Sequence, residues 1–109
     1  MLFEEFGQIL TDAFEETPYW VGSSLTEKTW RDVDVRVLMD KKKYSAMGLG
    51  DPRYPLENAK WRAFARAFST LGTEITGLPI DFQIQEQSDA NKTYPRARSA
   101  LGLSTKIKR

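Results

Sequence analysis

Two aspartates one position apart are the residues of this chain whose types and spacing could do chemistry. Asp32 and Asp34 lie in a valine-rich stretch that also contains Val33, Val35 and Val37. Because alternate residues of a strand point to the same face, the two carboxylates would project side by side, opposite the valines. Neighbouring carboxylates repel each other and resist joint ionisation unless a cation lies between them. Such hard oxygen ligands suit magnesium or manganese better than zinc, so the pair predicts half of a metal site.

A third aspartate, Asp81, lies in a second alternating stretch, residues 79–85. The apolar residues of this stretch would share one face: Ile80, Phe82 and Ile84. If this strand neighbours the first one in a sheet, Asp81 emerges on the same open face as Asp32 and Asp34. Three converging carboxylates are a poor arrangement for stability and a good ligand set for a divalent cation.

A glycine–serine turn precedes the paired aspartates. Gly22, Ser23 and Ser24 follow a short predicted strand over residues 19–21 and come before a predicted short helix over residues 25–30. The free N–H groups at a helix start attract anions, and glycine lets a phosphate approach the backbone closely. Ser23 or Ser24 would also cap the short helix. We therefore expect a phosphate-binding turn beside the metal site.

Hydrophobic periodicity predicts the elements that position these residues. We expect helices over residues 2–16, over 25–30 and from 55 or 56 to 72 or 77, and strands over 19–21, 32–39 and 79–85. The expected apolar stripe of the last helix is Leu56, Ala59, Ala63, Phe64, Ala67, Phe68 and Leu71. Residues 40–55, which contain Lys41–Lys43, are expected to form a long loop. This order fits an α/β (α+β) two-layer sandwich, in which a small mixed sheet carries helices on one face and the carboxylate site on the other.

The composition narrows the possible chemistry. The 109 residues include no cysteine and no histidine, which excludes disulfides, Cys/His zinc sites and histidine-based catalysis. Any catalysis must use carboxylates, hydroxyls, basic side chains, backbone amides and a metal. No apolar run approaches transmembrane length, and the acidic N-terminus is unlike a signal peptide. We therefore expect a soluble, cytoplasmic protein that does not contact membranes.

Charge is unevenly distributed along the chain although the net charge is +1. Residues 1–40 hold nine acidic and three basic side chains (net −6), whereas residues 87–109 hold one acidic and six basic ones (net +5). The six basic residues are Lys92, Arg96, Arg98, Lys106, Lys108 and Arg109. We expect residues 1–86 to form the domain and residues 87–109 a basic C-terminal tail. This tail could bind a phosphate backbone of RNA or simply be a solvated terminus.

Taken together, these motifs resemble the DNA polymerase beta-type nucleotidyltransferase superfamily, and within it the minimal nucleotidyltransferases. The motif combines a hydrophobic-Gly-Ser turn, an Asp-x-Asp strand and a later strand with a single aspartate between hydrophobic residues. In this chain the three parts are Val21-Gly22-Ser23, Asp32-Val33-Asp34-Val35 and Ile80-Asp81-Phe82. The resemblance covers roughly residues 3–86.

The resemblance implies an enzyme that transfers a nucleoside monophosphate from a nucleoside triphosphate to a hydroxyl of RNA, a protein or a small molecule. The three aspartates would hold two magnesium or manganese ions, and Asp81 would also help to activate the acceptor hydroxyl. Gly22 and Ser23, with Ser24 beside them, would bind the β- and γ-phosphates. A homodimer, another partner or the basic tail would supply contacts that larger relatives take from extra domains.

Two alternatives remain open from the sequence. Arg36 lies on the same strand face as Asp34, where it either neutralises the carboxylates or contacts a nucleotide phosphate. The whole chain could also be a catalytically degenerate module of the same fold that binds nucleic acid or a partner protein, like an antitoxin. Dependence on a divalent metal distinguishes the enzyme from the binding module.

Overall fold

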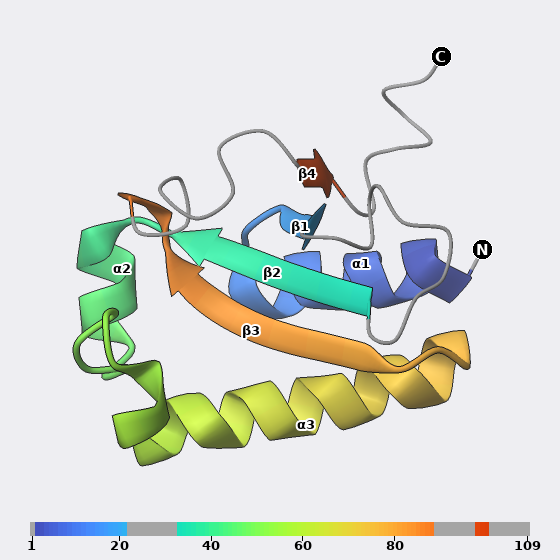
Figure 1. The fold of residues 1–109 in the computed structure, drawn as a ribbon. Coiled ribbons are helices and arrows are strands. Elements are labelled where there is room, and N and C mark those ends of the chain that lie inside the picture. The colour runs from blue at the N-terminus through green and yellow to red at the C-terminus, as the bar shows by residue number, and fades with distance from the viewer. Residues whose placement is uncertain (1, 22–32, 89–97, 101–109) are drawn as a thin grey trace.

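The computed structural model describes residues 2–21, 33–88 and 98–100, which form an α+β sandwich around a mixed four-stranded sheet (Figure 1). The strands are β1 (Pro18–Val21), β2 (Val33–Met39), β3 (Ile80–Glu86) and β4 (Arg98–Ala100), in the spatial order β3-β2-β1-β4. β2 pairs in parallel with β3, and β1 pairs antiparallel with both β2 and β4. The predicted fold class is confirmed. β4 adds a short segment of the predicted tail to the sheet.

Two long helices cover one face and one edge of the sheet (Figure 1). They are α1 (Leu2–Phe14) and α3 (Ala59–Thr76), and the short helices α2 (Lys41–Ala46) and η2 (Pro55–Glu57) lie between β2 and α3 along the chain. The valines of β2 and the apolar residues of β3 are buried against the long helices, as the alternation predicts: Val33, Val35, Val37, Ile80, Phe82 and Ile84. Among the described residues no helix is long and apolar enough to cross a membrane.

A cluster of aromatic rings joins the two helices to the sheet. Phe14 at the end of α1 lies 5.1 Å from Phe68 of α3 and 5.8 Å from Phe82 of β3, measured between ring centroids. Phe64 lies 5.8 Å from the same Phe14 ring in an edge-on arrangement. Offset and edge-on contacts at these separations add to the free energy gained from burying the rings.

The predicted loop over residues 40–55 is wrong in its first part, where the structure has the helix α2. Asp40 caps this helix, because its side chain accepts a hydrogen bond from the backbone N–H of Lys43 at 2.7 Å. The Lys43 ammonium then reaches the end of α1, where it donates to the carbonyl of Phe14 and pairs with Glu16 at 2.9 Å. α2 therefore ties the end of β2 to the end of α1.

The buried face of α3 matches the predicted stripe only in part, since Phe64 and Phe68 pack against the core as expected. Its most buried residues are Trp61 and Gly72, whereas Ala59, Ala63 and Ala67 are exposed. Leu56, expected on the same stripe, is 70% exposed. The helix passes through Gly72 and ends at Gly77, whose backbone φ of 75° is typical of a glycine that closes a helix.

Candidate carboxylate site on the open face of the sheet

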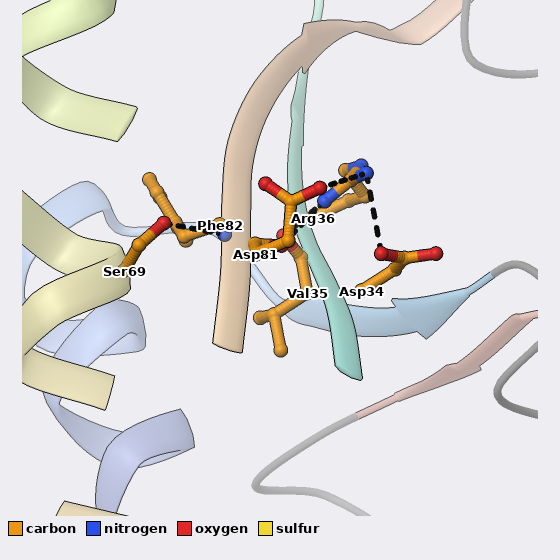
Figure 2. Close-up of polar contacts among 6 residues, drawn as sticks. All are labelled: Asp34, Val35, Arg36, Ser69, Asp81 and Phe82. Atoms are coloured by element: carbon orange, nitrogen blue, oxygen red, sulfur yellow. Dashed lines mark hydrogen bonds and ion pairs between the residues drawn. The ribbon is translucent and has the colours of Figure 1, made fainter. Parts of the chain in front are cut away.

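Two of the three predicted carboxylates face each other on neighbouring strands. The parallel register of β2 and β3 pairs Asp34 directly with Asp81. Since the apolar residues of both strands point to the helices, the two aspartates project from the opposite face of the sheet (Figure 2). Their side chains are 22% and 42% exposed, respectively. The expectation that these two strands are neighbours and that their aspartates share a face is confirmed.

Arg36 lies between the two carboxylates (Figure 2). Its Nη2 is 3.8 Å from Oδ1 of Asp34 and 3.5 Å from Oδ2 of Asp81. Its Nη1 donates hydrogen bonds to the backbone carbonyls of Asp81, at 2.6 Å, and of Val35, at 3.1 Å. The arginine side chain is only 4% exposed, and its Nε has no hydrogen-bond partner in the described part of the chain. The guanidinium therefore offsets the negative charge of the pair, as one of the two alternatives for this residue supposes.

The sequence pattern does not reveal that Arg36 is buried. A charged residue at an alternating strand position indicates a solvated face. Here the guanidinium has hydrogen-bond partners in the carbonyls of Val35 and Asp81 and charge partners in the two carboxylates. A buried charge is tolerated when it is paired in this way.

Carboxylate oxygens are ligands of the kind that hard divalent cations take, but in this structure the Arg36 guanidinium lies beside both of them. Both Arg36–carboxylate distances are longer than the N–H···O hydrogen bonds of about 2.7–3.2 Å. The arginine therefore contributes charge without clamping the carboxylate oxygens in a two-pronged hydrogen-bonded pair. Two carboxylates and one guanidinium carry a net charge of −1, which attracts a cation less strongly than the bare pair of aspartates.

The remaining predicted site residues lie outside the described residues. These are Asp32, Gly22, Ser23 and Ser24. In the described ranges, no group of three histidine, cysteine, aspartate or glutamate side chains is close enough together to hold a metal. The described part of the predicted site is thus the pair Asp34 and Asp81 together with Arg36. Of the basic tail, only Arg98 falls in a described element, β4.

One feature next to the site was not predicted. On the edge of β3 that faces away from β2, backbone groups form hydrogen bonds with a row of α3 side chains. Thr73 accepts a hydrogen bond from the N–H of Ile80 at 3.0 Å, and Ser69 accepts one from the N–H of Phe82 at 2.8 Å (Figure 2). Four residues of helix rise about 6 Å and two residues of strand about 6.6 Å. Every fourth residue of α3 can therefore contact every second residue of β3.

The same row continues to Trp61, whose indole Nε1 donates to the carbonyl of Ile84 at 2.8 Å. These side chains form hydrogen bonds with backbone groups on the free edge of β3, which would otherwise be available for pairing with another strand. They also fix the strand that carries Asp81 against α3. The spacing of Trp61, Ser69 and Thr73, at multiples of four, is the sequence pattern from which this row could have been found.

Comparisons with known proteins identify no relative of this chain. No protein-family model matches the chain. No significant match was found among curated proteins or among solved structures.

Proposed function

We propose that this chain is a metal-dependent nucleotidyltransferase of the polymerase beta type. One observation carries the proposal: Asp34 and Asp81 are register partners on adjacent parallel strands and project from the same face of the sheet. Carboxylates that are paired across neighbouring strands could serve as ligands of a divalent cation, and the chain has no histidine or cysteine for catalysis of another kind. The Gly-Ser and Asp-x-Asp motifs of the sequence agree with this assignment.

In this proposal each residue of the motif has a role. Asp34 and Asp81, with Asp32, would hold magnesium or manganese, two ions in the complete site. The metal would supply Lewis-acid stabilisation of the charge on the transferring phosphoryl group. Arg36, which lies beside both carboxylates, would contact an oxygen of a bound triphosphate. The Gly22-Ser23-Ser24 turn would bind the outer phosphates, and the reaction would take place in the cytoplasm.

A label-transfer assay tests this function. The purified protein is incubated with magnesium or manganese, each α-labelled nucleoside triphosphate in turn, and cellular RNA or lysate as a source of acceptor. We expect transfer of label by the wild type and its loss in Asp34→Asn and in Asp81→Asn. Asp12→Asn, an exposed acid on α1, is the matched control and should transfer as the wild type does. Transfer that survives both site variants, or its absence from the wild type with every acceptor, contradicts the proposal.

A second candidate function rests on Arg36. Because its guanidinium already lies between the two carboxylates, the site resembles a structural ion-pair network. The chain would then be a catalytically degenerate module that binds nucleic acid or a partner protein. Thermal denaturation separates the two candidates. The enzyme gains stability when magnesium and a nucleoside triphosphate are added together, whereas the degenerate module has the same melting temperature with and without them.

A further inference from the structure

A shallow groove runs along α3 on the side that adjoins the free edge of β3. It has a volume of about 520 Å³. Its lining includes Leu56, Ala63 and Ala65 as apolar residues and Arg62, Arg66 and Ser69 as polar ones. Ser69 also accepts the hydrogen bond from Phe82, the residue after Asp81, so the groove adjoins the strand that carries the carboxylate site (Figure 2).

The charge of this groove is positive. Arg62 and Arg66 are both exposed, and none of the described residues that line the groove is acidic. The two arginines are four residues apart, so they lie on neighbouring turns of one helix face. Arg62 donates one hydrogen bond to the carbonyl of Leu56 at 2.6 Å, which orients the guanidinium and leaves other N–H groups for a ligand. Two adjacent arginines on an apolar floor suit successive phosphates of a chain.

An exposed aromatic residue, Tyr54, precedes the groove-lining segment along the chain. Tyr54 is 54% exposed, and it lies two residues before Leu56, which is 70% exposed and lines the groove. The guanidinium carbon of Arg53 lies 5.5 Å from the centre of the Tyr54 ring. Arg53 is itself engaged by Asp51 at 3.0 Å and, by donating to that carboxylate, holds the pKa of Asp51 below its usual value. Because the charge of Arg53 is already paired with Asp51, this segment offers a ligand the exposed ring of Tyr54 rather than a further positive charge.

We infer that the α3 groove binds single-stranded nucleic acid, with Arg62 and Arg66 contacting consecutive phosphates and Tyr54 stacking on a base. A positive groove that follows the backbone, together with an exposed aromatic ring, is the combination by which proteins hold single strands without reading their sequence. An acidic peptide would satisfy the arginines but would make no use of the exposed ring. The inference depends on α3 and its preceding turn, and not on the carboxylate pair, so it stands whether or not the chain transfers nucleotides.

Fluorescence anisotropy with a labelled oligouridine of about ten nucleotides tests the inference, with oligothymidine as a second probe. The variant Arg62→Gln/Arg66→Gln removes both phosphate contacts, and Lys41→Gln/Lys42→Gln removes the same charge from exposed positions of α2. Circular dichroism and melting temperature confirm that each variant is folded.

The expected effects follow from counterion release. Each phosphate contact to a single strand contributes about 0.7 to the slope of log K against log salt. Loss of two contacts should therefore reduce the slope by about 1.4 and weaken binding about 25-fold at about 0.1 M salt. The α2 variant should change affinity much less. Tyr54→Ala should weaken binding roughly fivefold or more, whereas Tyr54→Phe should bind like the wild type because it keeps the ring.

Three results would overturn the inference. The first is no binding of either oligonucleotide by the wild type at low salt. The second is an equal loss in the α3 and α2 charge variants, which would mean that the protein attracts polyanions without a site. The third is that a polyaspartate peptide displaces the oligonucleotide at equal charge concentration, and that Tyr54→Ala weakens the binding of neither. This result would assign the groove to an acidic protein segment. Because binding is measured without triphosphate or metal, failure here leaves the test of nucleotidyl transfer unaffected.

Discussion

Replacement of Arg36 by methionine should destabilise the fold through the two carboxylates that it neutralises. Methionine keeps most of the length and apolar volume of the buried side chain but removes its charge and its hydrogen bonds to two backbone carbonyls. In the variant, Asp34 and Asp81 remain register partners on neighbouring strands but lose the Arg36 guanidinium that lies between them. Repulsion between the aspartates and unpaired backbone carbonyls both favour the unfolded state.

The size of this effect can be worked from the distances. Unit charges about 4 Å apart attract by about 4 kcal/mol at an effective dielectric constant of about 20, before the cost of removing them from water is subtracted. Breaking a fully buried pair costs about 3–5 kcal/mol in practice. The carboxylates of Asp34 and Asp81 are 22% and 42% exposed, so water screens part of the interaction. We therefore expect Arg36→Met to lower the free energy of unfolding by about 2–4 kcal/mol.

Urea denaturation followed by circular dichroism measures this change. Arg66→Met, at an exposed position of α3, is the matched control and should change the free energy of unfolding by less than about 0.5 kcal/mol. The double variant Arg36→Met/Asp81→Asn removes one of the two repelling charges and should recover about 1–2 kcal/mol of the loss. The reasoning is refuted if Arg36→Met is no less stable than Arg66→Met, or if the double variant recovers nothing.

Two further predictions concern the contacts of α3. Ser69→Ala should lower the free energy of unfolding by about 1–2 kcal/mol, because the N–H of Phe82 loses its acceptor and a gain in helix propensity offsets only part of the cost; chemical denaturation should show no such loss for the exposed control Thr70→Ala. Gly72→Ala should lower it by about 1–3 kcal/mol, because an added Cβ would lie 2.6 Å from the ring of Phe6. A Gly72→Ala protein with an unchanged melting temperature would show that α1 and α3 are not packed this closely.

The strands and the facing of the carboxylates could be predicted from the sequence because strand alternation is a local property. The valines of β2 occupy every second position, and the side chains between them must therefore point the other way. The pairing of Asp34 with Asp81 required one non-local assumption, that β2 and β3 are neighbours. A long helix between two strands makes that parallel arrangement the usual one, and the structure has it.

Part of the buried face of α3, the helix α2 and the burial of Arg36 were not predicted, because they depend on tertiary contacts or on a helix cap that the sequence analysis did not consider. The alanines of α3 have helical spacing, but the large residue Trp61 is buried in their place because its indole can donate to the edge of β3. The lysine-rich stretch after β2 suggests a solvated loop, yet Asp40 in front of it is a good helix cap, and Lys43 gains a partner on α1 that no local pattern reveals. The burial of Arg36 likewise depends on groups from a strand that is distant in sequence.

Binding of manganese measured by electron paramagnetic resonance tests the central claim most directly, because free manganese gives a signal that is lost when the ion binds. We predict saturable loss of the signal when wild-type protein is added with a non-hydrolysable triphosphate analogue, and no such loss with Asp34→Asn/Asp81→Asn. Glu5→Gln/Asp12→Asn, which removes the same charge from exposed positions of α1, should behave as the wild type does. Equal binding by the site variant and the wild type, or no binding by the wild type, would contradict the assignment of Asp34 and Asp81 as metal ligands.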